Sequence, residues 1–136
     1  MGWRAPDPAG IALAFGDEVK TPRACRLLLV EPDTACGRTL AAVFRRQGYV
    51  VRLVHSRAAA LRAAREVIYE IGVVDLFVRG GGLELARELR RRVRRLVLCV
   101  GPALARAEVL HAAVGFPIHR KTALSRVLRQ AGLRVS

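Results

Sequence analysis

Five short apolar runs alternate with segments of helical periodicity along the chain, and this alternation constrains the fold more than any other feature. The runs that we expect to be strands are Arg26–Val30, Tyr49–Val54, Ile71–Val74, Leu96–Val100 and Phe116–His119. Continuous apolar runs of this length indicate strands that are covered on both faces. Strict alternation of such strands with helices predicts a doubly wound parallel sheet of five strands, with five helices in layers on its two faces.

The segments between these runs carry the start and stop signals of helices. Asp33 or Thr34 is suited to cap the first helix, because short polar side chains accept hydrogen bonds from free N–H groups, and Gly48 is suited to end it. Ser56 can cap a second helix, from Arg57 to about residue 67. The other three helices are expected to begin at Leu83, Pro102 and Thr122 and to end near Arg92, Gly115 and Gly132.

One stretch, residues 69–82, links a buried strand to a helix through a turn of three glycines. The strand delivers the carboxylate of Asp75 to its carboxyl end. The glycines match neither the dinucleotide-binding nor the P-loop spacing. We therefore interpret Gly80 to Gly82 as a turn rather than as a phosphate cradle.

The length of 136 residues is that of one domain with one core. Residues 1–23 contain three prolines and three glycines without periodicity, which predicts a loosely ordered N-terminal extension before a domain over residues 24–136. No apolar run is long enough to span a bilayer, and no cysteine pair has metal-binding spacing. We expect a soluble intracellular protein with reduced thiols and no membrane contact.

The net charge of +13 comes almost wholly from arginine. Such a charge admits nucleic acid, an acidic protein or a membrane surface as a partner. The arginines are spread over several expected helices with few aromatic residues among them, so we favour solvated helix surfaces over nucleic-acid binding. The densest cluster comprises Arg90, Arg91, Arg92, Arg94 and Arg95.

Charged residues follow several of the expected strands at their carboxyl ends, where open parallel sheets bind ligands. Glu31 follows the first strand, Asp75 ends the third and Lys121 follows the fifth. Two close carboxylates favour a divalent cation, and hard oxygen ligands suit Mg²⁺. A lysine beside them can pair with Asp75 or with a phosphoryl group placed on it, and a carboxylate that takes a phosphoryl group is an established form of covalent catalysis.

With these residues in place, the chain resembles a receiver domain of bacterial two-component response regulators over about residues 26–131. The resemblance lies in the segments LLLVEPD and LAAVFRRQGYVV, in YEIGVVDL and in GLELARELRRR. It implies a flavodoxin-like fold in a cytoplasmic bacterial protein. It also implies a histidine kinase or a phosphotransfer protein as phosphodonor, and no enzymatic activity beyond self-phosphotransfer and autodephosphorylation.

The resemblance assigns roles to four residues. Asp75 falls at the phosphoacceptor position, and Lys121 at the lysine that contacts the phosphoryl group. Glu31 falls at the first of two paired acids that act on the metal. Mg²⁺ would be held by Glu31, Asp75 and the backbone carbonyl of Phe77.

The sequence departs from the family pattern at several positions. The second metal-binding acid is Pro32, which predicts weakened Mg²⁺ binding. The hydroxyl residue that senses the phosphoryl group is Val100, and the aromatic switch position is Ile118. The family's proline after the lysine is Thr122, and the loop after Asp75 is about one residue short.

These matches and departures leave two classes of function open. In the first, the protein is a stand-alone receiver that accepts a phosphoryl group on Asp75 and passes the signal to a partner. In the second, it is a degenerate receiver that binds partners without phosphorylation. In either case a partner, or a second copy, would dock on the face formed by the fourth helix, the fifth strand and the fifth helix. A basic nucleic-acid-binding adaptor is a third and weaker alternative.

Overall fold

The computed structural model of the chain describes residues 25–101 and 115–132. Its five strands are β1 (Arg26–Val30), β2 (Val50–Val54), β3 (Tyr69–Asp75), β4 (Val93–Val100) and β5 (Ile118–Arg120). Its helices are α2 (Thr34–Arg46), α3 (Arg57–Glu66), α4 (Gly82–Leu89), the short 3₁₀ helix η2 (Lys121–Ala123) and α6 (Leu124–Gly132). Residues 102–114 of the expected fourth helix, and the expected extension at 1–23, lie outside the described residues.

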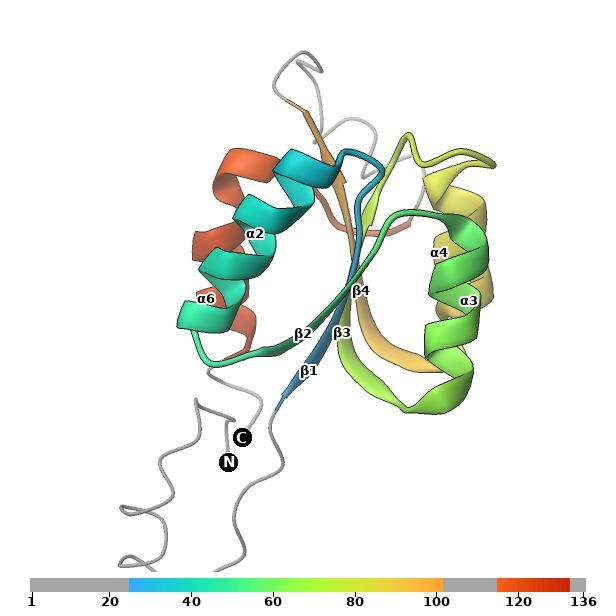
Figure 1. Cartoon of the computed structure of the whole chain (residues 1–136), viewed down its shortest axis with the longest axis horizontal. Coiled ribbons are helices and arrows are strands. Elements are labelled where there is room, and N and C mark those ends of the chain that lie inside the picture. The colour runs from blue at the N-terminus through green and yellow to red at the C-terminus, as the bar shows by residue number, and fades with distance from the viewer. Residues whose placement is uncertain (1–24, 102–114, 133–136) are drawn as a thin grey trace, which may run out of the picture.

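All strand pairs are parallel, and the sheet has the order β2-β1-β3-β4-β5. Helices α2 and α6 cover one face of the sheet, and α3 and α4 cover the other (Figure 1). This arrangement confirms the predicted doubly wound five-stranded α/β fold. It also brings the carboxyl ends of β1 and β3 side by side, because these two strands are direct neighbours.

Successive residues of each strand point to opposite faces, so each strand contributes to two cores. Leu28 and Val30 of β1 pack toward α3 and α4, whereas Leu27 and Leu29 pack toward α2 and α6. All four side chains are fully buried. This double burial explains why the strand reads as one continuous apolar run rather than as an alternating pattern.

Two predicted helix caps are confirmed and one is wrong. The Asp33 side chain accepts a hydrogen bond from the backbone N–H of Cys36 at 2.8 Å, and Ser56 caps α3 in the same way through Ala59 at 3.1 Å. Thr122 was expected to cap the last helix, but it lies inside η2, and α6 begins at Leu124. The chain leaving β5 forms a tight 3₁₀ turn before the helix, and this turn starts at Lys121.

Several strand boundaries also differ from expectation. β3 begins at Tyr69 rather than Ile71, and β4 begins at Val93 rather than Leu96. The first residues of both strands include charged side chains that are not buried, and these interrupt the apolar pattern. β5 runs from Ile118 to Arg120 rather than from 116 to 119. Within the described residues, no helix is long and apolar enough to cross a membrane.

Candidate functional site

Three charged side chains meet at the carboxyl edge of the sheet. Glu31 directly follows β1, and its backbone N–H donates a hydrogen bond to Val54 at 3.0 Å, which fixes the residue to the sheet. Asp75 is the last residue of β3 and pairs in register with Cys99 of β4. Lys121 opens η2 directly after β5 and reaches toward both carboxylates. The sequence predicted this convergence from the positions of the strand ends, and the structure brings the three residues together.

The Lys121 ammonium bridges the two carboxylates. Its Nζ lies 2.5 Å from Oε1 of Glu31 and 2.6 Å from Oδ2 of Asp75. The two acids are 1% and 5% exposed, so the fold holds both away from water. Two buried carboxylates are costly without a cation, and the lysine supplies one positive charge between them. The cluster defined by these three residues therefore keeps one net negative charge.

The remaining carboxylate oxygens are held by backbone N–H groups of the following loops. Oδ1 of Asp75 accepts from Phe77 at 2.7 Å, and Oε2 of Glu31 accepts from Asp33 at 3.0 Å. Burial by itself would lower the pKa of Lys121. Hydrogen bonds and charge from Asp75 and Glu31 outweigh it and raise the pKa of Lys121 above its ordinary value. The ammonium is therefore charged at neutral pH.

The turn at Gly80 to Gly82 packs against the backbone of Asp75 and fixes its position. Gly80 and Gly81 have φ of +93°, a conformation that side-chain-bearing residues rarely adopt. A Cβ at Gly82 would lie only 2.3 Å from the backbone oxygen of Asp75. The three glycines thus allow α4 to start directly against the end of β3, which agrees with their interpretation as a turn.

The oxygen donors at this edge suit a divalent cation in part. Oε1 of Glu31 is buried and makes no hydrogen bond of normal geometry within the described residues. Both this oxygen and Oδ2 of Asp75 contact the Lys121 ammonium. Two carboxylates with the Phe77 carbonyl fit Mg²⁺, which usually retains several waters. Pro32 is exposed and offers no side-chain oxygen, and the Asp33 carboxylate caps α2 instead. No group of three or more His, Cys, Asp and Glu suited to a metal occurs in the described parts of the chain.

Buried apolar residues occupy the two positions where the family resemblance places the phosphoryl-sensing hydroxyl and the aromatic switch. Val100 is fully buried and Ile118 is 4% exposed, and both belong to the core cluster beneath α3 and α4. Ile118 pairs with Leu98 of β4. These residues contribute to packing and offer no hydroxyl or aromatic side chain near Asp75.

Other residues considered from the sequence lie away from the cluster or outside the described chain. Arg94 and Arg95 belong to β4 rather than to a loop, and the Arg90 guanidinium stacks 4.5 Å from the ring centroid of Phe116. The sequence indicates that the three histidines are surface residues or hydrogen-bonded residues rather than metal ligands, and one of them, His111, lies outside the described residues. For His55 this interpretation is confirmed, because its Nδ1 lies 2.8 Å from the backbone oxygen of Glu31.

Comparisons with known proteins give the fold but no close relative. No protein-family model matches the sequence, and no curated protein matches it either. Solved structures do match. A CheY-like response regulator receiver domain from Methanospirillum hungatei is 20% identical with a TM-score of 0.64, covering 79% of this chain and 89% of that chain. A CheY-like receiver domain from Methylobacillus flagellatus is 21% identical with a TM-score of 0.64, covering 79% and 98%.

A third match is a response regulator from Burkholderia pseudomallei, solved with a phosphorylated aspartic acid, a calcium ion and citrate. It is 26% identical with a TM-score of 0.66, and the match covers 80% of this chain and 66% of that chain. The chain therefore has the flavodoxin-like fold of CheY-like response regulator receiver domains, and the match covers about four fifths of its length.

Proposed function

We propose that this protein is a response regulator receiver that accepts a phosphoryl group on Asp75 from a histidine kinase or a phosphotransfer protein. The observation that carries the proposal is the Lys121 ammonium, held between the buried carboxylates of Asp75 and Glu31. A fold that needed only packing would avoid two buried acids, because their desolvation costs more than apolar residues would. The resemblance to a response regulator solved with a phosphorylated aspartic acid supports the same assignment.

The chemistry follows from the positions of these groups. An Asp75 oxygen attacks the phosphorus of the donor, the bond from phosphorus to the donor's leaving group breaks, and an acyl phosphate forms on the carboxylate. Lys121 is placed to neutralise charge on the transferred group, since its ammonium already contacts Oδ2. Hydrolysis of the acyl phosphate would return the site to its starting state. We propose no enzymatic activity beyond this self-phosphotransfer and autodephosphorylation.

Mg²⁺ would be held by Glu31, Asp75 and the Phe77 carbonyl, with water completing its coordination. When bound, it supplies additional neutralisation of the phosphoryl oxygens. Because Pro32 removes one acidic ligand, we expect weaker Mg²⁺ binding than three carboxylates would give. Lys121 also occupies the space between the two acids, so the metal has to compete with an ammonium that is already in place.

Intact mass measurement after incubation with acetyl phosphate and Mg²⁺ tests the proposal. We expect an increase of one phosphoryl group on the wild type and none on Asp75→Asn. Asp33→Asn is the matched control, because that carboxylate is exposed and caps α2, and this variant should still be labelled. Labelling of Asp75→Asn, or no labelling of the wild type, would contradict the proposal.

A second candidate function is a phosphorylation-independent interaction module. It is favoured by Pro32, whose side chain cannot bind a metal. It is also favoured by the buried Val100 and Ile118, which offer no hydroxyl or aromatic group to sense a phosphoryl group. A partner would then bind Asp75→Asn and wild type equally well. The first candidate predicts that phosphorylation changes partner binding.

A further inference from the structure

The two ends of the sheet differ in charge. At the amino end, the strand starts and the chain leading into them carry seven basic and two acidic residues: Arg26, Arg52, Arg90, Arg91, Arg92, Arg94 and Arg95 with Glu66 and Glu70. At the carboxyl end, the strand ends and the described chain leaving them carry four basic and three acidic residues: Arg57, Arg79, Arg120 and Lys121 with Glu31, Asp33 and Asp75. The amino end therefore has a net charge of +5, against +1 at the carboxyl end.

Two exposed aliphatic side chains lie at the same end. Three large hydrophobic side chains are exposed in the described parts of the chain, and two of them, Val50 and Ile68, belong to the amino end with exposures of 51% and 52%. Val50 is the first residue of β2, and Ile68 directly precedes β3. Both side chains would gain free energy on transfer from water to an apolar medium.

The order of the strands groups these aliphatic residues around an arginine. β1 lies between β2 and β3, and its first residue, Arg26, pairs in register with Val50. The backbone N–H of Arg26 donates a hydrogen bond to Oε2 of Glu70 at 2.9 Å, which ties it to the start of β3. Val50 and Ile68 thus lie on either side of Arg26. The loop before β4 is next to them, because the backbone N–H of Tyr69 donates to the oxygen of Arg92 at 3.4 Å.

The two acids of the amino end already have partners within the protein. Glu66 forms an ion pair with Arg52 at 3.3 Å, and Glu70 accepts the hydrogen bond from Arg26. The ion pairs among the described residues include none of Arg26, Arg92 and Arg94, which are all exposed. Positive charge at this end is therefore available to an anionic partner.

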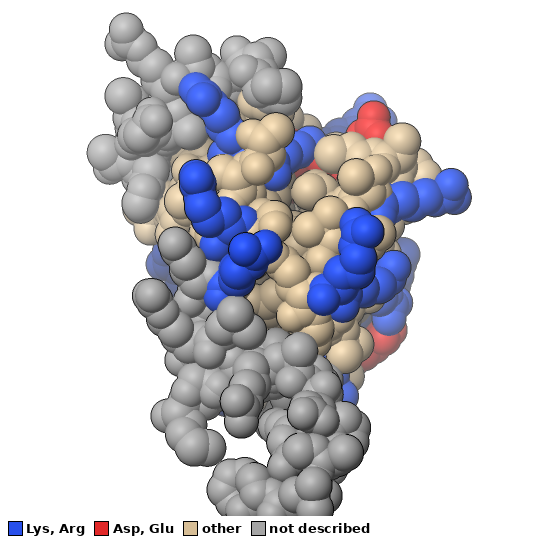
Figure 2. Space-filling view, turned by 90° about the vertical axis from the view of Figure 1, so that its left-hand side faces the viewer, with Lys and Arg blue, Asp and Glu red and all other residues tan. Residues whose placement is uncertain are grey.

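The side of α2 and α6 shows that charge alone does not single out the amino end. Figure 2 looks onto that side, where Lys and Arg side chains stand apart on a largely uncharged surface. None of the exposed large hydrophobic side chains of the described residues belongs to α2 or α6. The amino end is distinguished by arginines that lie beside exposed aliphatic side chains.

We propose that the amino end of the sheet binds the surface of a membrane that contains anionic phospholipids. Arginines are attracted to the negative headgroups, and aliphatic side chains beside them enter the boundary between headgroups and acyl chains. Such binding needs no membrane-spanning helix. The sequence-based expectation of no membrane contact rested on the lack of a spanning run, so it does not bear on binding of this kind.

Other anionic partners fit this surface less well. Nucleic acid would satisfy the arginines but would leave Val50 and Ile68 without an apolar contact. Among the described residues, the amino end also presents no exposed aromatic side chain on which a base could stack. A second copy of the chain would bring arginines against arginines.

A membrane at the amino end would lie opposite the charged cluster, because Glu31, Asp75 and Lys121 are at the carboxyl ends of the strands. The proposed phosphorylation site would then face away from the lipid. The inference goes beyond the proposed function and does not depend on it, because binding requires the arginines and the aliphatic side chains rather than phosphorylation of Asp75.

Cosedimentation of the full chain with lipid vesicles tests this surface. One set of vesicles is phosphatidylcholine alone, and the other is a roughly two-to-one mixture of phosphatidylcholine and phosphatidylserine. The protein should bind the anionic vesicles at least about tenfold more tightly at low salt, and added salt should reduce this advantage. Equal binding to the two sets, or no binding to either, would overturn the proposal.

Two kinds of variant locate the binding surface. Arg92→Glu/Arg94→Glu should weaken binding to the anionic vesicles about tenfold. Val50→Ser/Ile68→Ser should also weaken it about tenfold, although it leaves the charge unchanged. Circular dichroism confirms that each variant is folded.

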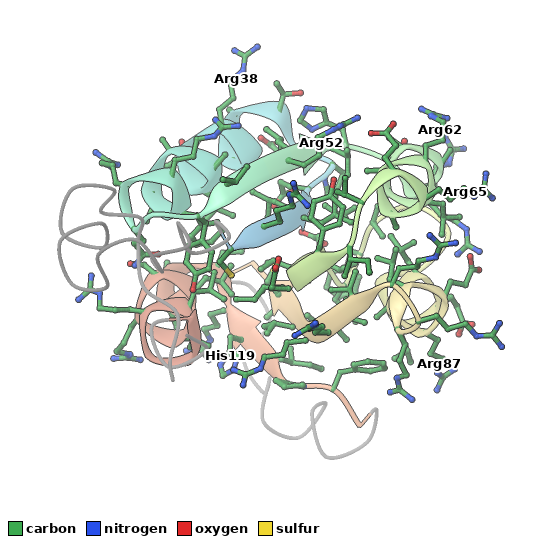
Figure 3. The ribbon with its side chains drawn as sticks, turned by 90° about the horizontal axis from the view of Figure 1, so that it is seen from below. Arg38, Arg52, Arg62, Arg65, Arg87 and His119 are labelled. Atoms are coloured by element: carbon green, nitrogen blue, oxygen red, sulfur yellow. The ribbon has the colours of Figure 1, made fainter. Side chains whose placement is uncertain are left out.

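The matched control is Arg38→Glu/Arg62→Glu, which changes the net charge by the same amount as the arginine variant. Figure 3 views the molecule from the amino end and shows Arg38 and Arg62 extending outward at its periphery. Because these side chains lie away from the strand starts, the control should weaken binding by about twofold at most.

Three outcomes would overturn the assignment. The first is an equal loss of affinity in the control, and the second is an unchanged affinity in both amino-end variants. The third is a loss in the arginine variant alone together with tight binding of a DNA duplex, which would make this a nucleic-acid surface. Asp75→Asn should bind the anionic vesicles as the wild type does, so a failure of the phosphorylation proposal would not affect this result.

Discussion

The carboxyl edge of the sheet has two corners of opposite character. The charged corner, comprising Glu31, Asp75 and Lys121, buries two acids around one ammonium. The apolar corner, comprising Cys99, Val100 and Ile118, is packed into the core without a hydroxyl or an aromatic side chain. Packing alone explains the apolar corner but not the charged corner, because buried ions stabilise a fold less than apolar residues of similar volume. The charged corner therefore indicates a chemical function, whereas the apolar corner indicates stability.

The largest effect should follow from removing the cation of the charged corner. Lys121→Met leaves two buried carboxylates facing each other without compensation, so it should lower the free energy of unfolding by about 3 kcal/mol at neutral pH. Urea denaturation measures this value. The matched control is Arg126→Met on the exposed side of α6, which should change stability by less than about 0.5 kcal/mol. Equal losses in the two variants would show that the lysine bridge contributes nothing.

Glycine substitutions compare the backbone at the two corners. Gly82→Ala forces a methyl group against the backbone of Asp75, and it should cost about 1–3 kcal/mol of stability. A Cβ at Gly101, at the end of β4, meets no atom of the described residues within 4 Å. Gly101→Ala should therefore be close to neutral. A neutral Gly82→Ala variant would mean that the start of α4 can move without affecting the site.

Alkaline pH should affect the apolar corner before the charged corner. Burial, with a smaller contribution from Asp75, raises the pKa of the Cys99 thiol above its ordinary value. Outside this corner, burial also raises the pKa of the Cys25 thiol, directly before β1, to about 12. A thiol with a raised folded-state pKa contributes stability that is complete below its unfolded pKa and is lost as pH rises. Each thiol should therefore cost up to about 1.4 kcal/mol per pH unit above about pH 8.5.

Urea denaturation of the reduced protein between about pH 8 and about pH 10 checks this slope. Lys121 stays charged over this range, because its pKa is raised by both carboxylates and its contribution is lost only above the unfolded lysine value of about 10.4. Cys99→Ala should flatten the pH dependence. An unchanged slope in that variant would show that the thiol of Cys99 does not control it.

The smallest effect should follow from placing a hydroxyl in the apolar corner. Val100→Thr puts a polar atom into a fully buried position, so it should cost about 1 kcal/mol of stability. Labelling of Asp75 by acetyl phosphate should be unaffected, because the charged corner is unchanged. A variant as stable as the wild type would show that the hydroxyl finds a hydrogen-bond partner next to the site.

The convergence of Glu31, Asp75 and Lys121 could be predicted from the sequence because strand ends in a parallel sheet define one edge. The pairing of Lys121 with Asp75 could also be predicted. Its simultaneous contact with Glu31 could not, because this contact depends on the 3₁₀ turn at Lys121, which carries no clear sequence signal. Strand starts such as Tyr69 and Val93 were missed since charged residues interrupt the apolar pattern there.

The Mg²⁺ dependence of Asp75 phosphorylation tests the central claim most directly. The initial rate of labelling by acetyl phosphate is measured against Mg²⁺ concentration for the wild type, Pro32→Asp and Asp75→Asn. We predict that the wild type is labelled only at high Mg²⁺, that Pro32→Asp saturates at a lower concentration, and that Asp75→Asn is never labelled. A wild type that stays unlabelled at every Mg²⁺ concentration, while Pro32→Asp is labelled, would contradict the account and identify a receiver fold without phosphotransfer.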